Sequence, residues 1–148
     1  MKKNTVSQRG FTLIEILVVI GIIAILAAIV IIAINPSRQF AQAHDTQRVS
    51  NVNAILNAIG QNIADNKGTL TCANGATITS ATSTIATGGA SGTVDLEGCL
   101  VPTYLPAMPT DPVGGTSANT KYTVAKWPSG RYAVHATGEI TTSIDVVR

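Results

Sequence analysis

The sequence predicts an α+β protein with one long N-terminal helix and a small antiparallel sheet. Three observations indicate this fold: a run free of polar and charged side chains at residues 16–34, a helical repeat of apolar residues after Pro36, and strand-like alternation after residue 120. The chain has 148 residues, the length of one ordinary domain.

Residues 1–10 are polar and basic, and the apolar segment 11–34 follows them. As a helix this segment is about 36 Å long, enough to span the hydrocarbon core of a bilayer. Lys2, Lys3 and Arg9 precede it, so the positive-inside rule predicts a cytoplasmic N terminus and an exported remainder. The apolar stretch shows no small-residue cleavage site of the secretory kind.

The composition and charge of the remainder limit what it can do. Apolar residues make up 45% of the chain but concentrate in its first quarter, so the rest can build only a small core. The formal charge is +2, and the first ten residues hold three of the ten basic side chains, which leaves seven against eight acidic ones. A near-neutral body has no electrostatic footprint for nucleic acid, and no specific nucleic-acid partner is predicted.

Helical periodicity resumes beyond Pro36. The missing N–H of this proline predicts a kink or local loosening of the helix. The apolar face is expected to consist of Phe40, Ala43, Val49, Val52, Ile55, Leu56, Ile59 and Ile63. The polar positions between them are Asp45, Arg48, Asn51, Asn53, Asn57, Asn62 and Asp65. Gly68 is predicted to end the helix in the left-handed C′ position, which gives a helix over residues 11–66 of about 80 Å if it is continuous.

The remaining segments predict connecting loops and then a sheet. Residues 69–93 are rich in small and hydroxyl side chains and are expected to form a loop or irregular hairpin, and the prolines of residues 102–112 exclude regular structure there. Three strands are predicted at residues 122–126, 131–136 and 139–147. They form an antiparallel meander, one face of which can pack on the helix at residues 40–65.

Cys72 and Cys99 are the two cysteines of the chain, and both lie in the segment predicted to be exported. An oxidising compartment and an even cysteine count favour a disulfide between them. Closing a loop of this length stabilises a fold by about 3–4 kcal/mol in the chain-entropy model. The alternative is two unpaired small hydrophobic side chains.

The segment GFTLIEILVVIGIIAILAAI, residues 10–29, resembles the N-terminal segment of type IV pilins and type II secretion pseudopilins. The resemblance rests on four features. They are a short basic leader that ends at Gly10, Phe11 as the new N terminus, Glu15 at the fifth position after cleavage, and an unbroken apolar helix. It implies a pilin-like fold, in which a long helix packs on a small antiparallel sheet.

The resemblance also implies a life cycle. A prepilin peptidase would cut between Gly10 and Phe11 and N-methylate Phe11. The mature chain would wait in the inner membrane as a single-pass protein, and an assembly platform with its ATPase would draw it into a helical homopolymer. It would be no enzyme. The implied divisions are a leader (1–10), a membrane or filament-core helix half (11–36), an amphipathic half (37–66), connecting loops (67–120) and a β-meander (121–148).

Glu15 is the one carboxylate of the apolar segment, and it needs a partner because a charge inside a membrane costs several kcal/mol. It can pair with the amine of its own Phe11 or, in a filament, with the amine of an adjoining subunit. Such a contact exists only at one axial offset, so it can set the register between subunits. The alternative is a glutamate that reaches the membrane interface without a partner.

Two departures from the family pattern affect the interpretation. Ile32 stands where many pilins carry a helix-loosening proline, so any melting on assembly shifts toward Pro36 or does not occur. Both cysteines precede the predicted sheet, so the C-terminal disulfide loop of adhesive pilins is missing.

Calcium is the one cofactor considered, and no other is predicted. The stretch LPAMPTDPVGG resembles the segment before the sheet of major pseudopilins, where loop oxygens bind calcium. Asp111 is the candidate ligand, with Asp95 and Glu97 as further contributors. Calcium prefers six to eight oxygen ligands, and the alternative here is a rigid Pro-Asp-Pro turn.

Other side chains give no sign of catalysis. His44 and His135 have no Cys or His at ligand spacing, and no catalytic residue or nucleotide-binding loop is predicted. Tyr122 and Trp127 are expected to cover the helix or to line a subunit contact rather than to bind a ligand.

Three functions agree with the sequence. The first is a structural pilin of a surface filament, for adhesion, motility or DNA uptake. The second is a pseudopilin, whose periplasmic filament works in protein export. The third is a membrane-anchored binding module. Extracellular filaments in quantity distinguish the first from the second, whereas the third predicts an uncut chain or one that never polymerises.

Overall fold

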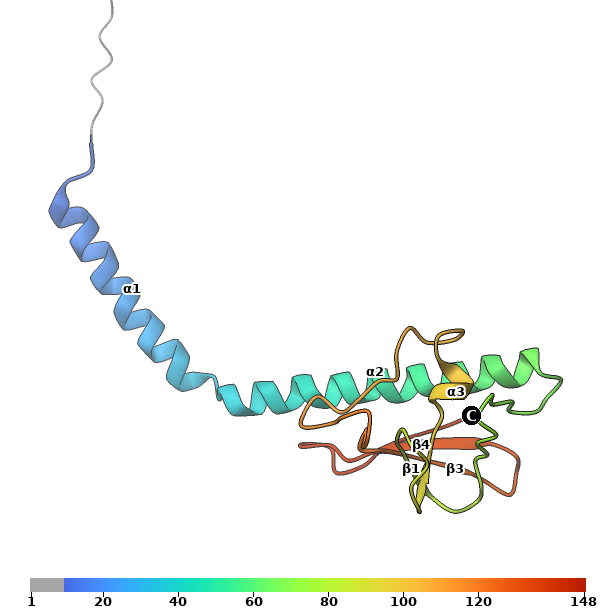
Figure 1. Ribbon diagram of the computed structural model, residues 1–148. Helices are drawn as coiled ribbons and strands as arrows, with labels where there is room; N and C mark the ends of the chain where they lie inside the picture. Colours follow the sequence, from blue (N-terminus) through green and yellow to red (C-terminus); the bar gives the residue numbers. More distant parts are fainter. Residues whose placement is uncertain (1–9) are drawn as a thin grey trace, which may run out of the picture. The chain divides into compact units, whose positions relative to one another are not determined.

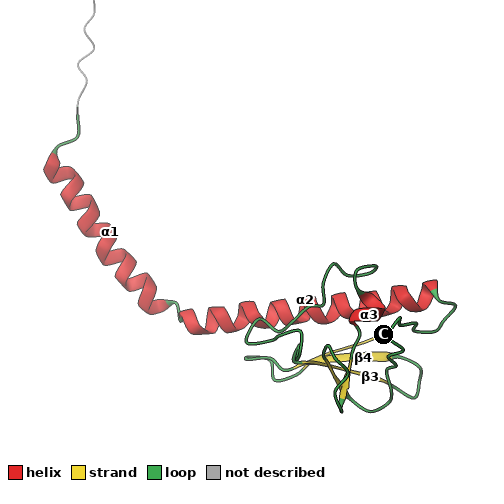
Figure 2. Cartoon of the chain, in the orientation of Figure 1, coloured by secondary structure: helices red, strands yellow, loops and turns green. Residues whose placement is uncertain are grey.

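The computed structural model describes residues 10–148 (Figure 1). The basic part of the predicted leader, with Lys2, Lys3 and Arg9, lies outside the described residues. The chain divides into two compact units at Ser37. The predicted α+β class is confirmed, with helices and a sheet in the second unit (Figure 2).

Helix α1 spans Leu13–Ala33, and none of its residues is buried. Its side chains are apolar on all sides apart from Glu15, so it has no polar face to turn toward water. A helix of this kind needs an apolar environment around its whole circumference. By length and composition it is a candidate membrane span.

The helix stops at Ala33 and a second one, α2, begins at Pro36 and ends at Asp65. Asn35 precedes a proline, which disfavours the helical conformation, whereas proline suits the first position of a helix. The Oδ1 atom of Asn35 accepts a hydrogen bond of 2.6 Å from the hydroxyl of Ser37. The predicted loosening at Pro36 is confirmed, and it amounts to a complete interruption between the two helices.

Helix α2 lies along one face of the sheet (Figure 1). The predicted apolar face is confirmed in the second half by the burial of Val52, Ile55, Leu56 and Ile59. Asn62, predicted as a polar position, is buried there as well. The prediction is wrong in the first half. Phe40 and Val49 are 67% and 43% exposed, whereas Asp45 and Arg48 are buried.

The C-terminal end of α2 differs by one residue from the prediction. The N–H of Gly68 donates to the carbonyl of Ile63 at 2.8 Å, which is the long bond of a Schellman motif. This bond makes Lys67 the C′ residue, with a left-handed φ of 57°, and Gly68 the residue after it, with a φ of 89°. Lysine therefore adopts the strained conformation that was predicted for glycine.

The sheet has five strands in the order β2-β1-β3-β4-β5. They span Ser83–Ile85 (β1), Thr93–Val94 (β2), Tyr122–Lys126 (β3), Tyr132–Ala136 (β4) and Ile144–Val147 (β5). The β1–β2 pair is parallel and the others are antiparallel. The predicted meander of β3, β4 and β5 is confirmed, but β5 begins at Ile144 instead of residue 139. The predicted loop at 69–93 contains β1 and part of β2, which are too short to show alternation in the sequence.

The core lies between α2, the inner face of the sheet and the short helix α3, which spans Glu97–Leu100. Tyr122 is at its centre with no exposed surface, which confirms that it covers the helix. Its hydroxyl accepts from the side chain of Asn51 at 2.8 Å and lies 3.3 Å from the carbonyl of Thr110, to which it donates. The tyrosine thus fills the core and satisfies its polar end.

The predicted disulfide between Cys72 and Cys99 is confirmed. Asn62 near the end of α2 holds both sides of this bridge. Its side chain donates to the carbonyls of Thr71 and Cys99 and accepts from the N–H of Thr71, each at 2.9 Å. The bridge and the asparagine together fix the segment that leads out of α2.

Removal of this bridge tests its share of the stability. We expect the double variant Cys72→Ala, Cys99→Ala to lose about 3–4 kcal/mol in the free energy of unfolding, because the unbridged unfolded chain regains the entropy of a 27-residue loop. Urea unfolding followed by circular dichroism measures the loss. Reductant added to the wild-type chain is the matched control and should give a similar shift, and an unchanged midpoint in both samples would contradict the expectation.

Candidate functional site

The segment around Gly10 and Phe11 is open. Gly10 has no heavy atom within 4 Å of the position that a Cβ would occupy, and Phe11 is 80% exposed. Both precede the first helical residue, Leu13. The peptide bond between them, which is the predicted cleavage site, therefore lies in non-helical chain that the described residues leave accessible.

Glu15 takes part in a capping box at the start of α1. Its carboxylate accepts the N–H of Thr12 at 3.4 Å, and its own N–H donates to the hydroxyl of Thr12 at 3.3 Å. This box satisfies two of the N–H groups that a helix start leaves unpaired. Our reading of the sequence missed it, although Thr-x-x-Glu before an apolar run is its known signature. The Glu15 carboxylate therefore has a hydrogen-bond partner, the Thr12 N–H, within its own chain.

The surface of α1 is apolar and uncovered. Its large apolar side chains are between 47% and 85% exposed, and Glu15 is its one charged residue. This arrangement fits either a lipid environment or the apolar surfaces of other helices.

Residues 6–34 match the family model of the prokaryotic N-terminal methylation motif. The chain carries this methylation motif. The motif is typical of type IV pilins and type II secretion pseudopilins. The apolar helix and the α+β fold agree with that type of protein. No curated protein and no solved structure matches the chain.

The motif has two general implications. Pilins and pseudopilins, of which it is typical, are processed by a prepilin peptidase and polymerise. The apolar helix and the motif also indicate a membrane-anchored precursor that later enters a filament.

A cluster of charged side chains in this pilin-like chain is centred on Arg48, whose side chain is 4% exposed. Its Nε and Nη2 atoms donate to the two carboxylate oxygens of Asp111 at 2.6 and 3.0 Å. Its Nη1 atom donates to Asp45 at 2.8 Å and to Glu139 at 3.0 Å. One guanidinium thus connects α2, the proline-rich segment and the β4–β5 loop.

Asp45 holds the β4–β5 loop by its backbone. Its carboxylate oxygens accept the N–H groups of Glu139, Ile140 and Thr141 at 2.8–2.9 Å. These bonds explain why residues 139–141 do not extend β5, since their backbone N–H groups bond to Asp45 on α2 instead of to a neighbouring strand. Gly138 is required beside them, because a Cβ there would lie 2.1 Å from the carbonyl oxygen of Thr141.

The contacts also set the charge states. The hydrogen bond from the Thr141 N–H, with those from Glu139 and Ile140, lowers the pKa of Asp45 well below its ordinary value of 3.8, against the opposing effect of burial. Burial raises the pKa of Asp111, but the hydrogen bonds from Arg48 and the Val113 N–H outweigh it and the net shift is downward. Both carboxylates are therefore ionised at neutral pH.

Asp111, the calcium candidate, lies in this ion pair. It accepts from both sides of the Arg48 guanidinium and from the Val113 N–H at 2.8 Å. Asp95 accepts instead from the backbone N–H groups of Glu97 and Gly88. Within residues 10–148 no group of three His, Cys, Asp or Glu side chains is placed to hold a metal ion. These contacts assign Asp111 to a structural role, and calcium binding stays a prediction.

The pH dependence of stability tests the role of Asp45. We expect Asp45→Asn to lower the free energy of unfolding by about 2–3 kcal/mol at pH 7, because charge-assisted hydrogen bonds are weakened. The folded-state pKa of Asp45 is lowered, so its contribution is full above the unfolded-state value near 3.8 and is lost as the pH falls through the folded-state value. The difference between wild type and variant should therefore be constant from pH 5 to 7 and shrink below about pH 4.

Chemical denaturation at each pH measures this difference. Asp65→Asn, on the exposed side of the same helix, is the matched control and should show a smaller and flatter effect. A difference for Asp45→Asn that stays the same from pH 7 down to pH 2 would show that the charge of Asp45 contributes nothing.

Proposed function

We propose that this chain is a structural subunit of a type IV pilus-like filament, cut after Gly10 and assembled through α1. The observation that carries the proposal is the 21-residue helix Leu13–Ala33, which is apolar on all sides and has no buried residue. Such a helix is stable in a bilayer before assembly and among the α1 helices of other subunits afterwards. The methylation motif supplies the processing step that separates the two states.

Glu15 is proposed to set the register between subunits. Cleavage after Gly10 would create a positively charged amine on Phe11, next to the Thr12 N–H that the Glu15 carboxylate accepts. The capping box thus holds the negative charge one residue from the place where a positive charge would appear. In the filament core the same carboxylate would meet the amine of an adjoining subunit, and a low dielectric makes that contact strong.

A pseudopilin of a type II secretion system is the second candidate. The Pro-Asp-Pro turn that leads into β3, anchored by Asp111 on Arg48, supports it, because the same stretch resembles that of major pseudopilins. A membrane-anchored binding module is the third. All three share an inner-membrane precursor with a cytoplasmic N terminus, and the first two require a prepilin peptidase, an assembly platform and an ATPase.

The intact mass of the chain in two fractions distinguishes the three candidates. We expect a chain that begins at N-methylated Phe11, abundant in material sheared from cells, and two hydrogens lighter before reduction than after it. The same processed chain found only in membranes would point to a pseudopilin. An uncut chain that begins at Met1 would overturn both filament proposals.

Substitution of Glu15 tests the register. We expect Glu15→Ala to enter the membrane normally and to give at least tenfold fewer filaments, because the charge that fixes the axial offset is gone. Glu15→Gln is the matched variant, since glutamine also closes a capping box but carries no charge. Filament yield is measured by shearing, and membrane insertion by the amount in the membrane fraction.

The two variants separate charge from capping. Loss of filaments in both assigns the effect to the charge. Normal yield from Glu15→Gln with loss in Glu15→Ala would mean that the cap alone matters, and normal yield from Glu15→Ala would remove Glu15 from assembly altogether.

A further inference from the structure

The outer face of the sheet, turned away from α2, carries two rows of side chains set by the strand register. The first row consists of Thr123, His135 and Asp145. The second row consists of Ala125, Ala133 and Val147. Polar groups thus lie side by side across three strands, and small apolar groups lie beside them.

The second row is hollow. Ala125 and Ala133 are direct cross-strand partners, at positions where strands usually carry bulky β-branched or aromatic side chains. Two facing alanines leave space over the sheet, and a groove of about 470 Å³ occupies it. The volume falls within the range of small-ligand sites in proteins.

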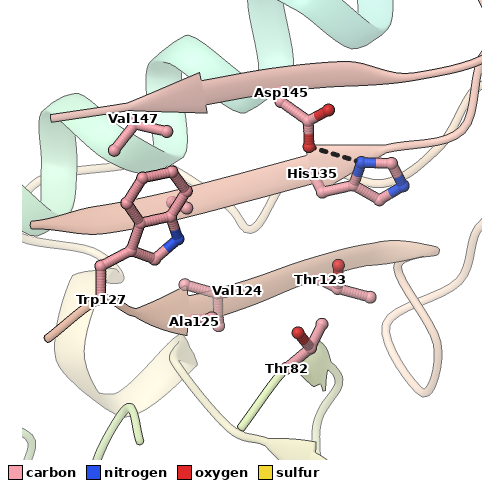
Figure 3. A pocket seen from close by; sticks show the side chains of 9 residues that line it. Thr82, Thr123, Val124, Ala125, Trp127, His135, Asp145 and Val147 are labelled. Atoms are coloured by element: carbon pink, nitrogen blue, oxygen red, sulfur yellow. Dashed lines mark hydrogen bonds and ion pairs between the residues drawn. The ribbon is translucent and has the colours of Figure 1, made fainter. Parts of the chain in front are cut away.

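The two ends of the groove differ in chemistry (Figure 3). Trp127 and Val147 lie at one end, whereas His135, Asp145 and Thr123 lie at the other. Trp127 is 45% exposed, and the guanidinium of Arg131 lies 5.4 Å from the centre of its ring. Trp127 therefore does not cover α2, which was one of its two predicted roles, and its ring lies at the mouth of the groove. The other role, a subunit contact, stays a prediction. Thr123 and Trp127, at opposite ends of the groove, are four residues apart, which corresponds to about 13 Å along an extended chain. The groove is therefore longer than one sugar ring.

The polar end of the groove contains donors and acceptors that can bind a ligand. Asp145 accepts from His135 Nδ1 at 2.8 Å and from the hydroxyl of Ser143. The hydrogen bond from Ser143, and after it the one from His135, lowers the pKa of Asp145. The carboxylate therefore stays ionised and can accept further hydrogen bonds. Within residues 10–148 the Nε2 atom of His135 and the hydroxyls of Thr82 and Thr123 make no hydrogen bond to protein, and all border the groove.

We propose that this groove binds a neutral oligosaccharide. A sugar has apolar C–H faces that can pack on the exposed indole of Trp127. Its hydroxyls both donate and accept hydrogen bonds, so they can donate to the Asp145 carboxylate and exchange hydrogen bonds with the His135 imidazole and the threonine hydroxyls. The site lies wholly within the unit of residues 38–148, so it does not depend on whether the chain forms a pilus, a pseudopilus or neither.

The groove fits other classes of ligand less well. No Lys or Arg lines it and Asp145 does, so the charge is wrong for the phosphates of a nucleic acid. Side chains on the face of the sheet line it, whereas the free backbone groups of the edge strand β5 lie in the plane of the sheet, so an extended peptide in the groove would find no backbone groups to pair with.

The single tryptophan of the chain makes the test direct, because binding changes the fluorescence of Trp127 alone. The full chain is solubilised in a detergent that contains no sugar and is titrated with cellotetraose, maltotetraose, chitotetraose and lacto-N-tetraose. We expect a saturable change with at least one of them. Oligothymidylate, titrated in the same way, represents nucleic acid and should give none.

Two variants keep the reporter and remove the site. Ala133→Leu fills the floor of the groove without removing any proposed contact, and should abolish the saturable change. Asp145→Ala should weaken binding at least tenfold. Phe40→Ala removes an exposed side chain of α2 outside the groove, and should bind as the wild type does. Circular dichroism of each variant confirms that it is folded.

Four results would overturn the proposal. They are no saturable change with any of the four sugars, an equal change in Ala133→Leu, saturation by oligothymidylate instead, and a fluorescence change on dilution without sugar. The last would show that a second copy of the chain fills the groove. None of them bears on cleavage after Gly10 or on filament formation, which are measured separately.

Discussion

The buried guanidinium of Arg48 holds together three segments that the chain delivers from distant positions. It donates two hydrogen bonds to Asp111, one to Glu139 of the β4–β5 loop, and one to Asp45, which in turn accepts backbone N–H groups of that loop. Removal of one partner from such a cluster leaves an uncompensated charge and typically costs about 3–5 kcal/mol. The sheet therefore keeps its place under the first half of α2 by ionic contacts, and under the second half by apolar packing.

The two helices have opposite relations to their surroundings. α2 buries one face against the sheet, whereas no residue of α1 is buried. The two helices are separated at Ile34 and Asn35, so each can pack in its own surroundings. Pro36 can begin α2 because the first residue of a helix has no intrahelical use for a backbone N–H, which proline lacks. In the proposed filament α1 would supply adhesion and Glu15 the register, while the unit that holds the sheet keeps its own core.

That outer face shows how a sheet can carry a site without catalytic machinery. Two alanines opposite each other open a hollow, and Trp127 and the His135–Asp145 pair give it an apolar and a polar end. The groove and the Arg48 cluster use different residues. The stability of the unit and its proposed recognition of sugars can therefore vary independently.

The sequence by itself determined the elements that depend on local pattern. Spacing and composition predicted the apolar run of α1, a loosening at Pro36, the periodicity of α2 from Val52 onward, the β3–β5 meander and the Cys72–Cys99 bridge. The tertiary structure alone decided the burial of Asp45 and Arg48, the left-handed Lys67, the strands β1 and β2, and the groove. Each of these depends on partners far away in the chain: charged residues are buried only where opposite charges and backbone donors meet them, and two alanines make a hollow only when strand register sets them face to face.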